Sequence, residues 1–213
     1  DREFFSLAEL GDIFDLARVH KAGAVFNIEK LEWFNAHAIR STALEVITEL
    51  CIPYLVNAGY ITVSDGGTYA IALTGQKISF DDIANMVALE HQRMKKLSDI
   101  SQSLSYLFSE TPNYDPHMLV WKDMTLVQMH ENLCYVKDQL AACTDNDFTK
   151  EALERIIKTA IEKAGKKNGE VLWPFRVALT GLTASPSPFE VAEVLGKEST
   201  VRRLDYAINL TQQ

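Results

Sequence analysis

Residues 172–203 read LWPFRVALTGLTASPSPFEVAEVLGKESTVRR and hold three helix boundaries. Pro174 has no amide hydrogen and a fixed backbone angle, which favours the first turn of a helix that Gly181 ends. Residues 187–190, SPFE, form a capping box with proline in the first helical position, so a second helix is predicted there. The loop 182–187 is therefore expected to lie rigidly between two helix ends and to present side chains to a partner.

The same stretch predicts a third helix. The second helix is expected to end at Gly196, and an amphipathic segment follows over residues 197–209. Its apolar face is formed by Val201, Leu204 and Ile208. Arg202 and Arg203 are predicted to point away from that face.

Two stretches of the chain resemble bacterial-type glutamyl-tRNA synthetases, in the part that follows the catalytic domain of those enzymes. The family carries a proline, then Leu/Phe-Arg-x-Ala-Leu-Thr-Gly, a short loop, Phe-Glu and Leu-Gly-Lys-Glu. These elements stand here at residues 174–181, 189–190 and 195–198. Residues 25–35, VFNIEKLEWFN, followed by Ile39-Arg40, are similar to the family's Phe-Asp-x-x-Lys-Leu-x-Trp-x-Asn helix. The two matches occur in the family's order.

The domain organisation follows from the helix signals and from one linker. Residues 111–116, TPNYDP, contain two prolines and turn-forming residues, which predicts a boundary there. We expect an all-α fold of two packed helical subdomains, over residues 1–112 and 113–213. The β-prone runs on either side of Asp65-Gly66-Gly67 predict a small β-hairpin insertion near residues 60–73, with an irregular loop as the alternative.

Further helices are predicted from caps and apolar periodicity. Asn27 is expected to open a helix that runs from Ile28 to about Glu49, with Trp33 packed in the core. Ser6 and Ser79 are expected to cap two others. The remaining predicted helices cover residues 51–56, 98–108, 118–122, 125–142 and 149–164.

The net charge of −8 argues on average against a polyanionic partner, but the charges are unevenly distributed. Residues 1–149 carry 11 Lys and Arg against 21 Asp and Glu, whereas residues 150–203 carry 10 against 7. Only the C-terminal third therefore has the sign that favours binding to RNA phosphates. An ordinary solvated surface is the alternative explanation of this asymmetry.

The cysteines indicate a reducing compartment. Cys51, Cys134 and Cys143 are odd in number and widely spaced, so we expect reduced thiols in a cytoplasmic protein. No run approaches the roughly 18 apolar residues of a membrane span, and the charged start DREFF is not a signal peptide. No membrane partner is therefore expected, and a start without methionine suggests a piece of a longer protein.

No catalytic constellation is found in the sequence. The five histidines form no HExxH pair, and there is no glycine-rich phosphate loop or GxSxG. The two ATP-binding motifs of a class I synthetase, His-Ile-Gly-His and Lys-Met-Ser-Lys-Ser, are also absent. We therefore expect no metal or cofactor in this chain. The resemblance implies that the parent enzyme attaches glutamate to tRNA with ATP and magnesium in a separate Rossmann-type domain.

The resemblance also implies a set of tRNA contacts. Arg176 is the expected contact to an anticodon nucleotide, and Arg93 is the candidate for reading the third anticodon base. The loop that closes on the central base contains Ser185, Pro186 and Pro188. Contacts to the RNA backbone are expected from Lys166, Lys167, Arg202 and Arg203, for which an ordinary surface position is the alternative.

The predicted function is recognition of the anticodon loop of a glutamate-accepting tRNA, alongside the missing catalytic domain. No DNA partner is expected. The alternative function is a helical protein-interaction module derived from the same scaffold, which the acidic N-terminal two-thirds would suit. The two functions differ in RNA binding, because only an RNA selector should distinguish anticodons and weaken as salt rises.

Overall fold

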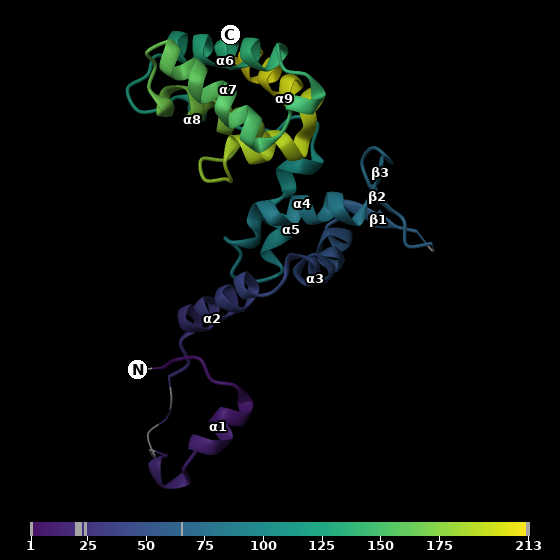
Figure 1. Cartoon of the computed structure of the whole chain (residues 1–213), viewed down its shortest axis with the longest axis vertical. Helices are drawn as coiled ribbons and strands as arrows, with labels where there is room; N and C mark the ends of the chain where they lie inside the picture. The colour runs from purple at the N-terminus through teal and green to yellow at the C-terminus, as the bar shows by residue number, and fades with distance from the viewer. Residues whose placement is uncertain (1, 20–22, 24, 65, 212–213) are drawn as a thin grey trace.

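The computed structural model describes residues 2–19, 23, 25–64 and 66–211 and is mostly helical (Figure 1). Within these residues there are nine α-helices and one three-stranded antiparallel sheet. The helices α6 to α9 form the upper part of the view, α3 to α5 and the sheet form the middle, and α1 lies farthest from the C-terminus. The predicted fold class is thus confirmed.

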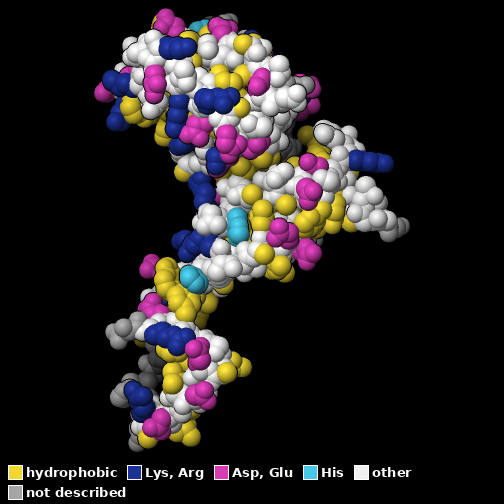
Figure 2. Space-filling view, viewed as in Figure 1, with side chains coloured by type: hydrophobic (Ala, Val, Ile, Leu, Met, Phe, Trp, Pro, Cys, Tyr) yellow, Lys and Arg dark blue, Asp and Glu magenta, His cyan; other side chains and the backbone are white. Residues whose placement is uncertain are grey.

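The N-terminal part contains α1 (Leu7–Ile13), a 3-10 turn (Leu16–Arg18) and α2 (Ile28–Ser41). Ser6 and Glu9 form the capping box that opens α1, yet α1 buries none of its residues. Trp33 on α2 was expected in the core, but it is 45% exposed and packs on the ring of Phe4, with ring centroids 5.2 Å apart. Apolar side chains are therefore frequent on this part of the surface (Figure 2).

The helix predicted from residue 28 to about residue 49 is interrupted. The structure ends α2 at Ser41 and begins α3 (Leu44–Asn57) after a break, because Thr42 adopts an extended conformation with ψ of 143°. The hydroxyl groups of Ser41 and Thr42 donate hydrogen bonds to the backbone carbonyls of His37 and Ala38. Side chains of this kind compete with helix continuation. The helix predicted over residues 51–56 is the second half of α3.

The predicted β-hairpin is confirmed as β1 (Ile61–Val63) and β2 (Tyr69–Ile71), which pair antiparallel with Thr62 opposite Ala70. A third strand, β3 (Lys77–Ile78), extends the sheet on the other side of β2. The sequence pattern missed β3 because two residues are too short to show an alternating period.

The first core lies among α3, the sheet, α4 (Phe80–His91) and α5 (Asp99–Ser103). Its buried members are Ile39, Ile47, Cys51, Leu55, Ile61, Ile83, Val87, Met94, Ile100, Leu104 and Phe108. The prediction of a single helix over residues 98–108 is wrong in one respect. This segment divides at Leu104 into α5 and the 3-10 helix η2 (Ser105–Phe108).

The second core lies among the 3-10 helix η3 (Pro116–Leu119), α6 (Leu126–Ala141), α7 (Lys150–Lys163), α8 (Asn168–Thr180) and α9 (Pro188–Leu210). Its buried members include Tyr106, Leu133, Val136, Leu153, Ile157, Phe175, Leu179, Phe189 and Leu204. Leu107 packs against both cores. The boundary proposed at residue 112 falls just after the chain leaves the first core, and it stays a prediction.

The helix α8 begins at Asn168, so Pro174 lies inside it and not in its first turn as expected. A proline in a helix leaves the carbonyl four residues earlier without its amide donor. Here Asn132 of α6 replaces that donor, because its Nδ2 lies 2.9 Å from the Glu170 carbonyl oxygen. As predicted, α8 ends at Gly181, whose φ of 69° is left-handed.

The capping box at the start of α9 is confirmed, with the Ser187 hydroxyl and the Glu190 carboxylate both bound to backbone amides. The predicted boundary between two helices at Gly196 is also confirmed. Gly196 is non-helical, with φ of 75° and ψ of 167°, and bends α9 into two segments.

Candidate nucleic-acid interface

Arg176 lies on α8 between the buried residues Phe175 and Val177, one turn before the helix ends. Its side chain is half-buried, and the Nε atom is buried without a hydrogen-bond partner. Within the described part of the chain Arg176 also forms no ion pair. A buried donor without a partner is unfavourable, but an external acceptor could not reach this atom. The terminal nitrogens of Arg176 are not among the buried unpartnered atoms and form no hydrogen bond with the described residues, so they are the donors that an external acceptor could use.

The loop after α8 is held at its start by Thr180. The Thr180 hydroxyl donates to the Arg176 carbonyl at 2.9 Å and accepts from the Leu182 amide at 3.1 Å. The next residues, Leu182, Thr183 and Ala184, are exposed. They form the outer rim of the loop and were not selected from the sequence, although their position between Gly181 and the capping box was visible there.

Ser185, Pro186 and Pro188 lie deeper than expected. All three are buried, and the Ser185 hydroxyl donates to the Pro186 carbonyl at 3.3 Å. The expectation that this loop presents its side chains outward is therefore wrong for these three. They shape the inner wall of the loop, whereas residues 182–184 are exposed.

Arg203 was expected to point away from the apolar face, and this is wrong. Its side chain is 1% exposed, and its Nη2 donates to the carbonyls of Tyr106 and Ser109, both at 2.7 Å. Its Nη1 donates to the carbonyl of Leu179. Burial lowers the pKa of Arg203 to about 10, so the guanidinium stays charged at neutral pH. The structure leaves Arg203 no surface with which to contact a nucleic acid.

The other predicted backbone contacts differ in accessibility. Arg202 and Lys167 are exposed and pair with Glu198 at 3.5 Å and Glu170 at 3.2 Å. Exposed pairs of this kind contribute little to stability and are easily exchanged for phosphate. Lys166 is half-buried, and its Nζ donates to Asn132 Oδ1 at 2.7 Å. The ammonium group of Lys166 is therefore already hydrogen-bonded within the protein.

Arg93 follows the end of α4, at the border of the first core, and its side chain is 41% exposed. Its Nε lies 3.4 Å from Glu90 Oε2, and the Glu90 side chain is only 7% exposed. Burial raises the pKa of Glu90, and Arg93 opposes this effect. Arg93 and Arg176 thus belong to different cores. Thr180 links the backbone carbonyl of Arg176 to the start of the 182–187 loop, whereas Arg93 is bound to Glu90.

The neighbourhood of Arg93 contains two further exposed cations. Lys95 Nζ lies 3.3 Å from Glu32 Oε2, and Lys96 Nζ lies 3.6 Å from Glu32 Oε1. His91 Nε2 lies 2.7 Å from the Ile39 carbonyl, so this nitrogen carries a proton. These contacts join α2 to the end of α4 and hold the cations on one surface.

The described residues contain no group of three or more His, Cys, Asp or Glu that is arranged to hold a metal ion. Among the helices of this part of the chain, none has the length and apolar composition needed to cross a membrane.

A family model described as an anticodon binding domain matches residues 29–208. The chain belongs to this family. It is 32% identical over 210 residues to a glutamate–tRNA ligase of Thermodesulfovibrio yellowstonii, a match that covers 98% of this chain and 42% of that protein. It is also 32% identical over 208 residues to a glutamate–tRNA ligase of Alkaliphilus metalliredigens, covering 97% and 39%. The chain thus spans about two fifths of the length of these relatives.

A solved structure has the same fold. It is a glutamate tRNA ligase from Elizabethkingia meningosepticum, crystallised in complex with its amino acid. The TM-score is 0.74 at 25% sequence identity, and the match covers 96% of this chain and 37% of that protein. The chain corresponds to the C-terminal part of such enzymes.

Proposed function

We propose that this chain binds the anticodon loop of a glutamate-accepting tRNA and distinguishes its bases. The observation that carries the proposal is the half-buried Arg176 side chain, which forms no ion pair with the described residues. It lies on the helix end that Thr180 joins to the exposed 182–184 rim, within a chain of the anticodon-binding domain family. Bases in a single-stranded loop are read through hydrogen bonds to their edges. An arginine whose terminal donors are not used within the protein can supply such bonds.

The predicted residues take different parts in this binding. Arg176 donates to an anticodon nucleotide, and Ser185, Pro186 and Pro188 form the inner wall that limits the size of the central base. Arg93 is the candidate for the third base. Lys167 and Arg202 attract phosphates. Lys166 and Arg203 are left out because the protein itself binds both side chains.

The rest of the activity belongs to the parent enzyme. That enzyme attaches glutamate to tRNA in the cytoplasm and uses ATP and magnesium in a catalytic domain outside this chain. Exposed apolar residues of the N-terminal part, such as Leu7, Phe14 and Phe26, would contact that domain. Apolar patches of this kind commonly mark protein interfaces.

The test is a titration of the chain with a labelled anticodon stem-loop whose anticodon reads C or U, then U, then C. A second stem-loop is altered at the central base, and both are measured at two salt concentrations. We expect tighter binding to the matched loop and weaker binding at the higher salt, because phosphate contacts release counterions.

Arg176→Ala should weaken binding of the matched loop by about 10-fold to 100-fold, the loss of a charged hydrogen bond. Arg155→Ala removes an exposed arginine from α7 and is the matched control, for which little change is expected. Equal losses in the two variants would contradict the role of Arg176. Binding that ignores both salt and anticodon would favour the protein-interaction module.

A further inference from the structure

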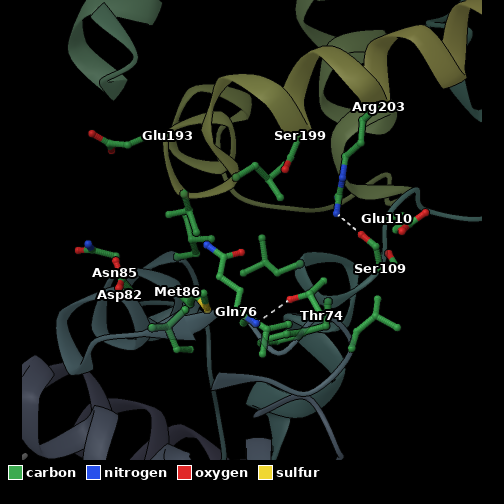
Figure 3. Close-up of a pocket in the computed structure, with 18 of the residues that line it drawn as sticks. Thr74, Gln76, Asp82, Asn85, Met86, Ser109, Glu110, Glu193, Ser199 and Arg203 are labelled. Carbon is green, nitrogen blue, oxygen red and sulfur yellow. Dashed lines mark hydrogen bonds between the residues drawn. The ribbon is translucent and has the colours of Figure 1, made fainter. Parts of the chain in front are cut away.

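A cleft of about 650 Å³ lies between the two cores. One wall comes from the sheet and α4, with Met86 and Gln76, and the other comes from α9, with Ser199 and Glu193 (Figure 3). Arg203 extends from α9 at one side of this cleft toward Ser109. It therefore connects the two walls where the chain passes between the cores.

The contacts of Arg203 join three distant segments. Through Nη2 it binds the carbonyls of Tyr106, in η2, and of Ser109, just after η2. Through Nη1 it binds the carbonyl of Leu179, in the last turn of α8. Tyr106 is buried in the second core, Leu107 packs against both cores and Phe108 belongs to the first, so η2 and Ser109 form the connection between the cores. Leu179 precedes the loop that follows α8.

The acceptors explain how a buried charge is tolerated. The last carbonyls of a helix have no partner within it, and they carry the negative end of the helix dipole. Arg203 binds the ends of α8 and η2 in this way. Among the described residues it has no carboxylate partner. A planar guanidinium presents several donors in a fixed fork, so one side chain satisfies all three carbonyls at once.

Other contacts also join the two cores. Leu107 packs against both cores, and α4 contacts α9 across the cleft. Apolar contacts are non-directional, whereas three hydrogen bonds from one rigid group fix an angle. Without these three hydrogen bonds, the cleft would leave room for the two cores to rotate relative to each other.

We propose that Arg203 is a positioning residue that sets the angle between the two cores. Arg93 on the first core and Arg176 on the second are thereby held in one arrangement, in which a single RNA loop contacts both. The statement that one RNA loop contacts both arginines rests on the proposed function, whereas the statement that Arg203 sets the angle does not.

The first experiment measures the angle without RNA. Amide residual dipolar couplings are recorded for α3 and α4 in the first core and for α6 and α7 in the second. In the unchanged chain, a single alignment tensor should fit the couplings of both cores. In Arg203→Met each set should still fit its own helices, but the two sets should require different alignments. Arg155→Met, on the exposed face of α7, is the control and should keep one alignment.

Arg203→Lys gives a second variant in case the methionine variant fails to fold. Lysine keeps the charge but has one ammonium group, which cannot replace the fork at all three carbonyls. We expect its two sets of couplings to differ as well. A single common alignment in folded Arg203→Lys, or in folded Arg203→Met, would overturn the proposal.

The second experiment measures binding of the matched stem-loop. If only a tenth of the molecules keep the native angle, the apparent affinity falls about tenfold. This loss is expected for Arg203→Met and not for Arg155→Met. An unchanged chain that binds no stem-loop would defeat the proposed function, while the couplings would still decide the role of Arg203. Altered couplings with unchanged affinity would overturn the link to RNA.

Discussion

Asn132 on α6 supplies the hydrogen bond that Pro174 on α8 cannot make. The proline has no amide hydrogen, and Asn132 Nδ2 lies 2.9 Å from the Glu170 carbonyl that is left open. The same asparagine accepts from Lys166 Nζ at 2.7 Å. A break in the backbone hydrogen bonds of one helix is thus closed by its neighbour, which ties α6 to α8.

This relationship predicts the outcome of a double-mutant cycle. Asn132→Leu should lower the free energy of unfolding by about 1–3 kcal/mol, because a buried carbonyl loses its partner. In a Pro174→Ala background the loss should be smaller, since an alanine amide can donate to the Glu170 carbonyl and only the contact of Asn132 with Lys166 is then lost. Urea unfolding of the four chains measures both values. Equal losses in the two backgrounds would show that Asn132 acts in some other way.

Gly181 and Gly165 provide a matched pair of left-handed positions, with φ of 69° and 64°. A β-carbon at Gly181 would lie 3.1 Å from Pro112 Cβ and 3.2 Å from Tyr114 Cδ1, whereas one at Gly165 would meet nothing within 4 Å. Gly165→Ala should therefore cost only the backbone strain, about 1–2 kcal/mol.

Gly181→Ala should cost more, because the 112–114 linker must also move. Thermal and urea unfolding would measure the difference, and equal costs for the two glycines would contradict the close approach of the linker.

The buried carboxyl group of Glu90 predicts a pH dependence of stability. Burial raises the pKa of Glu90 in the folded state, so the folded chain binds this proton more tightly than the unfolded chain. The contribution of Glu90 to stability is present in acid, below its unfolded pKa, and is lost as the pH rises through the folded pKa.

Glu90→Gln should therefore stabilise the chain more at pH 7 than at pH 4. Unfolding curves at the two pH values test this, with Glu49→Gln as the control because Glu49 is exposed on α3. A gain that is the same at both pH values would argue against the titration of Glu90.

Lys166 and Lys167 are adjacent in the chain but should behave differently in RNA binding. Lys167 is exposed, so Lys167→Gln should reduce the slope of log affinity against log salt by about one unit. Lys166→Gln should leave that slope unchanged and instead destabilise the fold by about 1 kcal/mol, because Asn132 loses a partner. Titrations at several salt concentrations and urea unfolding separate the two effects. The reverse pattern would contradict the assignment.

Much of this fold could be predicted because its boundaries depend on local chemistry. The capping boxes at Ser6 and Ser187, the stop at Gly181 and the bend at Gly196 are all signals within a few residues. The hairpin was also predicted, since its two strands flank a glycine turn. These features are as the sequence indicates.

Two of the errors concern side chains whose partners lie far away in the sequence. Arg203 is charged, so the pattern placed it at the surface, and its acceptors lie 94 and 97 residues earlier. Pro174 is found inside α8 only because Asn132, 42 positions before it, compensates for it. Local patterns contain no information about such long-range partners. In the candidate site, the local patterns indicated Arg176 as a binding residue, but they did not indicate the exposed rim of residues 182–184.

The tryptophans are distributed unequally between the two cores. Trp173 packs against the second core, where its Nε1 donates to the Met118 carbonyl at 2.9 Å. Trp33 packs on Phe4 outside both cores, and among the described residues the first core contains no tryptophan. The third tryptophan, Trp121, lies with its ring against Gly169 of α8. Intrinsic fluorescence of the tryptophans therefore reports on the second core, its surroundings and α2, while circular dichroism reports on every helix. A chain whose first core melts separately would keep the fluorescence of Trp173 while it had already lost helix.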